Sequence, residues 1–152
     1  QGSRCILTEL QALVTQSFLT MPRRVTAGID SNRLNLVVAV LEKHAGLKFY
    51  NRDVFVNVAG GLKLTEPGGD LGLAMALAGS LNDQSLPKDT LLVGELTLAG
   101  EVRPVAQVAR RINEGRRFGF SRFIVASGCE LTDNKGIVQV ATVREAIKAV
   151  FS

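Results

Sequence analysis

The chain has 152 residues, of which 46% are hydrophobic and 21% are charged, a balance typical of one globular domain and not of a disordered segment. Its formal charge of +4 and its pI near 9.4 permit nucleic-acid binding without requiring it. No apolar run is long enough to cross a membrane and no signal-peptide pattern opens the chain, so we expect a cytoplasmic protein.

The first third of the sequence predicts two strands and a helix. Apolar residues recur on one side of the range 4–16, which favours a long strand, and the range 23–29 indicates a second strand in a hairpin with the first. A helix is predicted from Asn32 to about His44, because Asp30 is a good N-cap and Gly46 a good C-terminal stop.

The centre of the chain joins a strand, a glycine-rich connection and a helix. The strand covers 54–58, and the helix runs from Leu71 to about Leu81 with no polar face up to Gly79, so it must be buried on most sides. Asp70 stands at the start of this helix, and its carboxylate is predicted to act as the N-cap. A catalytic carboxylate needs a second titratable group, and none stands beside it in the sequence.

The last third predicts further alternation of strands and helices. In chain order we expect a buried strand over 90–96, a hairpin over 97–104, a helix from Val105 to about Phe118, strands over 122–126 and 136–141, and a helix over 143–151 capped by Thr142. Ala109 and Ile112 belong to the predicted apolar stripe of the first of these helices, and Phe118 to the core. One α/β domain with mixed strand pairing, residues 1–152, follows.

Residue types that bind metals or transfer protons are scarce. Cys5 and Cys129 lie far apart without a CxxC pair, so we predict no metal site. We interpret His44, the only histidine, as a residue of the last helical turn, where positive charge suits the helix dipole, and not as a catalytic base. The glycine pairs at 60–61 and 68–69 lack P-loop spacing, and no serine elbow accompanies the histidine, which argues against nucleotide hydrolysis and a Ser-His-Asp hydrolase.

A family resemblance rests on four segments that recur in the same order and spacing. DVFVNVAGG, PGGDLGLAMALAGSL, GELTLAGEVRPV and FGFSRFIVAS make the range 51–126 similar to the peptidase domain of the Lon proteases. That resemblance implies a catalytic serine at the start of the buried helix and a catalytic lysine on the helix after the hairpin.

Both catalytic positions of that pattern are degenerate here. Asp70 stands where the serine would be, and Ala109 stands where the lysine would be. Aspartate cannot form the acyl-enzyme by the serine route and alanine has no amine to accept a proton, so we expect no peptidase activity. Ser80 with Lys63 or Lys88 is a poor substitute, because Ser80 lies roughly 15 Å along the helix from its start.

A narrower resemblance covers nearly the whole chain. With ELQALV, PRRVTAGID, NRLNLVVAVLEKHAGL and LAGEVRPV, the sequence looks like the C-terminal Lon-like domain of the RadA (Sms) family of bacterial DNA repair proteins. This implies a ribosomal protein S5 domain 2-like fold, a homohexameric ring, and a zinc finger and RecA-like ATPase outside these residues. It further implies branch migration of recombination intermediates beside RecA recombinase in the bacterial cytoplasm, near the nucleoid. ATP, magnesium and zinc would serve the full-length family, and no cofactor would serve this domain.

Two groups of arginines are the candidates for DNA contact, because arginine binds phosphate through paired hydrogen bonds. The candidates are Arg23, Arg24 and Arg33 in the first half, and Arg110, Arg111, Arg116 and Arg117 on the late helix. One group would line a DNA channel, for single-stranded or branched DNA. A solvated face or intersubunit ion pairs would explain the same residues equally well. We also expect no aromatic stacking platform beside either group.

Overall fold

The protein is described by a computed structural model that covers residues 9–59 and 67–152. Predictions that fall on Cys5, Lys63, the glycine pair at 60–61 and the range 4–8 lie outside the described residues. The predicted mixture of helices with parallel and antiparallel strand pairs is confirmed. The elements in chain order are β1 Leu10–Gln16, β2 Arg24–Ala27, α1 Ser31–Ala45, β3 Arg52–Val58, the 3-10 turn η2 Pro67–Gly69, α2 Asp70–Leu81, β4 Thr90–Val93, β5 Glu95–Leu96, β6 Val102–Arg103, α3 Val108–Arg117, β7 Arg122–Ala126, β8 Ile137–Val140 and α4 Val143–Phe151.

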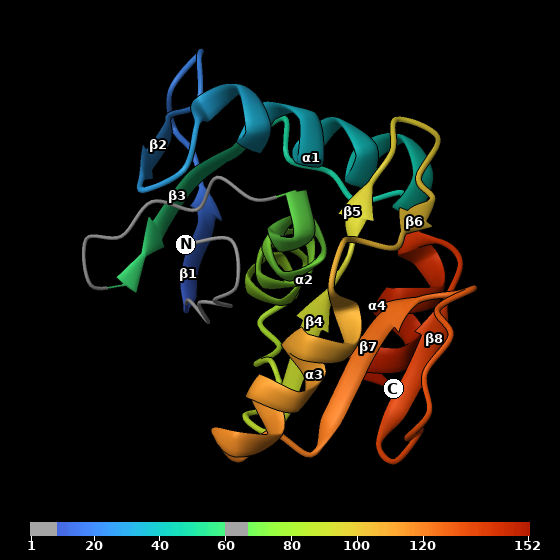
Figure 1. The fold of residues 1–152 in the computed structure, drawn as a ribbon. Helices are drawn as coiled ribbons and strands as arrows, with labels where there is room; N and C mark the ends of the chain where they lie inside the picture. The colour runs from blue at the N-terminus through green and yellow to red at the C-terminus, as the bar shows by residue number, and fades with distance from the viewer. Residues whose placement is uncertain (1–8, 60–66) are drawn as a thin grey trace.

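Helix α2 is the centre of the fold. Figure 1 places it between one sheet of β1, β3 and β2 and a second sheet of β4, β7 and β8. Every residue from Leu73 to Gly79 is buried, as the absence of a polar face predicted. A helix that is apolar on all sides is stable only when neighbours cover it all round, and here α1, α4 and both sheets do so.

The first sheet has the order β1-β3-β2, so the predicted hairpin of its first two strands is wrong. β1 pairs antiparallel with β3, whereas β2 pairs parallel with β3. The reason is α1, which carries the chain from the end of β2 back to the start of β3 and makes a crossover connection. Ala12, Val14, Val54 and Val56 face the core with α2, and the opposite face of this sheet carries no helix.

The second sheet is parallel throughout and is covered on both faces. Leu91, Val93 and Phe123 pack with Ile112 of α3, while Ile124 and Val140 join the main core with α2 and α4. The strand predicted over 90–96 is broken at position 94, where the backbone N–H donates to Gly68 O and the carbonyl accepts from Leu71 N. These two bonds fasten the start of α2 to the junction of β4 and β5.

Capping predictions succeed where the signal is local. Asp30 accepts a hydrogen bond from Asn32 N, Gly46 adopts the left-handed conformation with φ 70°, and Thr142 accepts from Glu145 N. Helix α3 starts at Val108 instead of Val105, because Gln107 has a left-handed φ of 61° that a helix cannot include.

The later start of α3 changes which of its residues reach the core. Ile112 and Gly115 are buried, whereas Ala109 is exposed and Phe118 is 69% exposed. The assignments of Ala109 to the apolar stripe and of Phe118 to the core are therefore wrong. Gly115 lets the helix approach the sheet closely, since a Cβ at this position would lie 2.8 Å from Leu91 Cδ2 and 2.9 Å from Phe123 Cε1.

We predict that Gly115→Ala lowers the free energy of unfolding by about 1–3 kcal/mol, because the added methyl group overpacks this contact. Alanine in place of glycine inside a helix normally gains up to about 1 kcal/mol. Asn113→Ala, on the exposed side of the same helix, is the matched control and should be neutral or slightly stabilising. Urea unfolding of both variants measures the difference, and a Gly115→Ala protein at least as stable as the wild type would contradict the packing argument.

Candidate functional site

Asp70 lies at the place that the Lon resemblance assigns to a catalytic serine, and its carboxylate is buried. The predicted N-cap role is wrong: Asp70 is the first residue of α2, and Gly69 occupies the N-cap position without a side-chain bond. The carboxylate turns away from its own helix and accepts from Arg33 Nε at 2.6 Å and from Leu96 N at 3.0 Å. It therefore joins α1, α2 and β5 through one side chain.

Two opposing influences act on this carboxylate. Burial raises the pKa of Asp70 above its usual value, and the Leu96 N–H and the Arg33 guanidinium oppose that rise. Arg33 retains 32% of its side-chain exposure while Asp70 retains 3%, so the aspartate carries most of the desolvation. With both of its oxygens bound, the carboxylate acts as a structural link.

No replacement for a serine–lysine pair is present among the described residues at this place. Ala109 is exposed on α3 and offers no amine. The Ser80 hydroxyl accepts a hydrogen bond from Val14 N at 2.8 Å, which fastens α2 to β1. His44, in the last turn of α1 as predicted, has Nε2 2.8 Å from Leu98 O at the tip of the β5–β6 hairpin. Each of these polar groups serves the packing of neighbouring elements.

The three N-terminal arginines have separate partners within the fold. Arg23 donates to the Asp53 carboxylate from both its backbone N–H, at 2.7 Å, and Nη2, at 3.0 Å. Arg24 donates to Asn35 Oδ1, and Arg33 is held by Asp70. Of the three, only Arg24, which is exposed and bound to a neutral group, has no ion pair with a described residue. The structure does not gather these three side chains into one cationic site.

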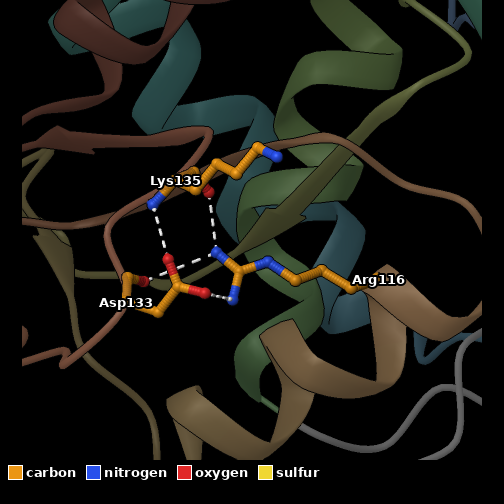
Figure 2. Close-up of polar contacts among 3 residues, drawn as sticks. All are labelled: Arg116, Asp133 and Lys135. Carbon is orange, nitrogen blue, oxygen red and sulfur yellow. Dashed lines mark hydrogen bonds and ion pairs between the residues drawn. The ribbon is translucent and has the colours of Figure 1, made fainter.

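Arg116 on α3 is also committed to the fold. Figure 2 shows its guanidinium enclosed by the loop of Asp133 and Lys135, with bonds of 3.1 Å to Asp133 Oδ2 and 2.7 Å to Lys135 O. The same group lies 5.4 Å from the centre of the Phe123 ring. These contacts hold α3 to the loop between β7 and β8, so Arg116 is a poor candidate for phosphate.

The remaining arginines of α3 differ in their exposure and in the contacts that they make. Arg117 is 79% exposed and contacts Glu114 at 3.6 Å, and Arg110 is exposed with no ion pair to a described residue. Arg111 is half-buried, donates to Ala106 O and lies beside Gly68, next to the turn that precedes α2. The sequence grouped four arginines by position in the chain, and the structure leaves two of them open to a ligand.

An aromatic ring does lie beside one arginine group, contrary to prediction. The Arg23 guanidinium is 5.6 Å from the centre of the Phe55 ring, and Phe18, in the loop leading to Arg23, is 90% exposed. The large apolar residues of SFLTMP, in a segment predicted to be a loop, were a sequence signal for exposed apolar side chains near Arg23. Strand pairing, which the sequence does not show, was needed to place Phe55 beside Arg23.

Comparison with known proteins places this fold in a family. Residues 23–128, more than half of the chain, match the model of the family described as subunit ChlI of Mg-chelatase. The chain belongs to the ChlI family. Across residues 9–59 and 67–152, no group of three His, Cys, Asp or Glu side chains could hold a metal ion. In the same residues no helix is long and apolar enough to span a membrane.

This ChlI-family chain is also similar to proteins named DNA repair protein RadA, as its motifs suggested. It is 45% identical over 150 residues to the Haemophilus influenzae protein, covering 99% of this chain and 33% of the relative. It is 49% identical over 125 residues to the Escherichia coli protein, covering 82% and 27%, and 42% identical over 156 residues to the Streptococcus pneumoniae protein, covering 100% and 37%. The chain spans about a third of the length of these curated relatives.

The two buried carboxylates should respond to pH in opposite directions. Asp70→Ala is expected to lower the free energy of unfolding by about 1–3 kcal/mol, because Arg33 and the Leu96 N–H lose their acceptor. Since its folded-state pKa is raised, the stabilisation by Asp70 is full below the unfolded value near 4 and declines as the pH rises through the folded value. Urea unfolding from pH 3 to pH 8 should therefore show that the free energies of unfolding of Asp70→Ala and the wild type differ most at the acid end.

Asp53→Ala is the matched comparison. The backbone N–H and side chain of Arg23 lower the pKa of Asp53, so its stabilisation is present above the unfolded value and is lost as the pH falls through the folded value. The difference between wild type and Asp53→Ala should thus shrink toward acid. The same pH trend in both variants would refute the assignment of opposite environments.

Proposed function

We propose that this chain is a non-proteolytic domain of a DNA repair protein that contacts DNA through α3. The observation that carries the proposal is the state of Asp70, whose buried carboxylate binds Arg33 and the Leu96 N–H at the position of the missing serine. A side chain held in this way cannot serve as a nucleophile, and exposed Ala109 supplies no base. Function is therefore assigned to the surface and not to this former catalytic place.

The DNA-contacting face is proposed to centre on Arg110 and Arg117. They are seven residues apart, which puts them on the same side of α3, and both are exposed. Arg117 can turn from Glu114 to a phosphate, because exposed ion pairs contribute little energy. Arginine bonds to phosphate oxygens fix the position of a duplex or single strand without reading its sequence.

The role of the longer protein is part of the same proposal. Similarity to bacterial proteins named DNA repair protein RadA supports a role in DNA repair. We propose that the protein works in the bacterial cytoplasm near the nucleoid. We propose that this domain has the Lon-like, ribosomal protein S5 domain 2-like fold and helps to assemble a homohexameric ring. The rest of the protein would carry a zinc finger and a RecA-like ATPase that uses ATP and magnesium, and it would act in branch migration with RecA recombinase.

A scaffold without direct DNA contact is the second candidate. It is favoured by the internal partners of Arg23, Arg33 and Arg116, because these three of the seven candidate arginines already bind acceptors within the fold. Under this alternative the domain would self-associate and show no salt-sensitive affinity for DNA.

We predict that Arg110→Gln with Arg117→Gln weakens binding to fluorescent single- and double-stranded DNA. Each lost phosphate contact should reduce the slope of log affinity against log salt by about 0.9 on duplex DNA and about 0.7 on single strands. The control is Lys43→Gln with Lys48→Gln, which removes two exposed positive charges away from α3. Equal effects of the two double variants would mean that only net charge matters, and no binding by the wild type would favour the scaffold.

We also predict that the wild-type protein forms no adduct with a serine-directed fluorophosphonate. Asp70→Ser should remain unreactive as well, because position 109 still provides no amine to activate the hydroxyl. Intact-mass measurement, with an active serine protease in parallel, detects the phosphonyl group. An adduct on Ser80 would revive the residual peptidase hypothesis.

A further inference from the structure

The outer face of the first sheet is an apolar surface that no element of the described chain covers. Strand register places Leu13 of β1, Phe55 of β3 and Val25 of β2 in one row across the sheet. Leu13 is 56% exposed and Val25 is 49% exposed, although the inner faces of the same strands are buried against α2. In Figure 1 this sheet forms the left side of the molecule, α2 lies to its right at the centre, and α3 lies below α2.

This row borders a groove of about 330 Å³ on the outer face. Its lining includes Leu13, Val25, Phe55 and Ala27, with Gln11 and Asn57 as the polar members. The neighbouring loop, residues 17–23, joins the ends of β1 and β2 and adds Phe18 and Met21, which are 90% and 83% exposed. Five of the nine large apolar side chains that are exposed in the described chain, Leu13, Phe18, Leu19, Met21 and Val25, belong to this face or its loop. We name Leu13, Val25, Phe55, Phe18 and Met21 the sheet-face patch.

One cation stands at the loop end of the sheet-face patch. The Arg23 guanidinium lies over the Phe55 ring, is 59% exposed, and uses Nη2 for Asp53. Its Nε and Nη1 make no hydrogen bond to a described residue, so they remain available to an incoming acceptor. Arginine and carboxylate form strong charge-assisted bonds beside apolar surface, where water is excluded.

We propose that the sheet-face patch is the docking site for a peptide segment of a partner protein, one that carries large apolar side chains next to a carboxylate. The apolar side chains would enter the groove between Leu13 and Val25, and the carboxylate would bind Arg23. Phe, Met and Arg on a concave apolar surface are the composition of protein interfaces, and contiguous exposed apolar area on a monomer marks such sites. The Nε and Nη1 donors of Arg23 that Asp53 does not use select a carboxylate, the acceptor that bonds most strongly to a guanidinium.

One other occupant, a nucleic acid, fits the patch less well. A nucleic acid requires several cations, whereas Arg23 is the one cation that residues 9–59 and 67–152 present on this face, which ends at exposed Glu9, in line with Gln11 and Leu13 along β1. Aliphatic side chains also outnumber the rings on which bases would stack.

The test is selection of a phage-displayed library of random 12-residue peptides on the immobilised 152-residue chain. Selected peptides should carry at least two large apolar residues and an Asp or Glu, and we expect synthetic, fluorescent versions to bind in anisotropy titrations. Leu13→Gln with Val25→Thr should weaken their binding at least tenfold, while Leu98→Gln, a 72% exposed site on the hairpin, should not. Replacing the acidic residue of the peptide by its amide should weaken binding several-fold, and this change leaves the protein intact.

Five results would overturn the proposal. Three concern peptides: failure to enrich any peptide, enrichment of peptides without a carboxylate, and equal peptide binding by Leu13→Gln with Val25→Thr. The fourth is light scattering that shows wild-type oligomers and a monomeric double variant, which would assign the patch to a second copy. The fifth is loss of oligo(dT) binding in the same double variant, which would assign the patch to single-stranded DNA. Circular dichroism of each variant confirms folding, and α3 variants are not involved, so this test is independent of the proposed DNA face.

Discussion

The structure depends on how a helix with no polar face begins. Helix α2 is stable only when α1, α4 and two sheets surround it, so its first turn also lies inside the protein. The N–H groups of a first helical turn lack helical partners and need acceptors. Leu71 N donates to Gly94 O. The Asp70 carboxylate, which is buried with this turn, accepts from Arg33 and from Leu96 N. The strand break at position 94 and the β5–β6 hairpin follow from these bonds, because they hold the chain against the helix start.

The local parts of this arrangement could be predicted from the sequence. The burial of α2, the caps at Asp30, Gly46 and Thr142, and the strand β7 all rest on patterns within a few residues. Errors arose where a partner came from far along the chain. Asp70 was predicted to be an N-cap because cap preferences concern neighbours, whereas Arg33 lies 37 residues away in sequence. The predicted hairpin in the first sheet was wrong for the same reason, because periodicity indicates a strand but not the strand with which it pairs.

The arginines illustrate the same limit for function. Residue type and clustering identified seven candidates, but whether a guanidinium is available depends on what it already binds. Arg116 lies on the same helix as Arg110, yet it is enclosed by Asp133, Lys135 and the Phe123 ring. The prediction that Asp70 and Ala109 stand at degenerate catalytic positions rests on resemblance alone, because an absent nucleophile leaves no sequence pattern of its own.

The start of α2 is occupied by a buried ion pair between Asp70 and Arg33. Breaking such a pair costs far more than forming it gains, because one charge would be left buried without a partner. The two sheets then differ in a way that bears on function. Within residues 9–59 and 67–152, the sheet of β4, β7 and β8 is covered on both faces, while the sheet of β1, β3 and β2 is covered on one. A protein gains nothing in stability from leaving Leu13, Val25 and Met21 in water, so the exposed face is better explained by what it binds than by how the domain folds.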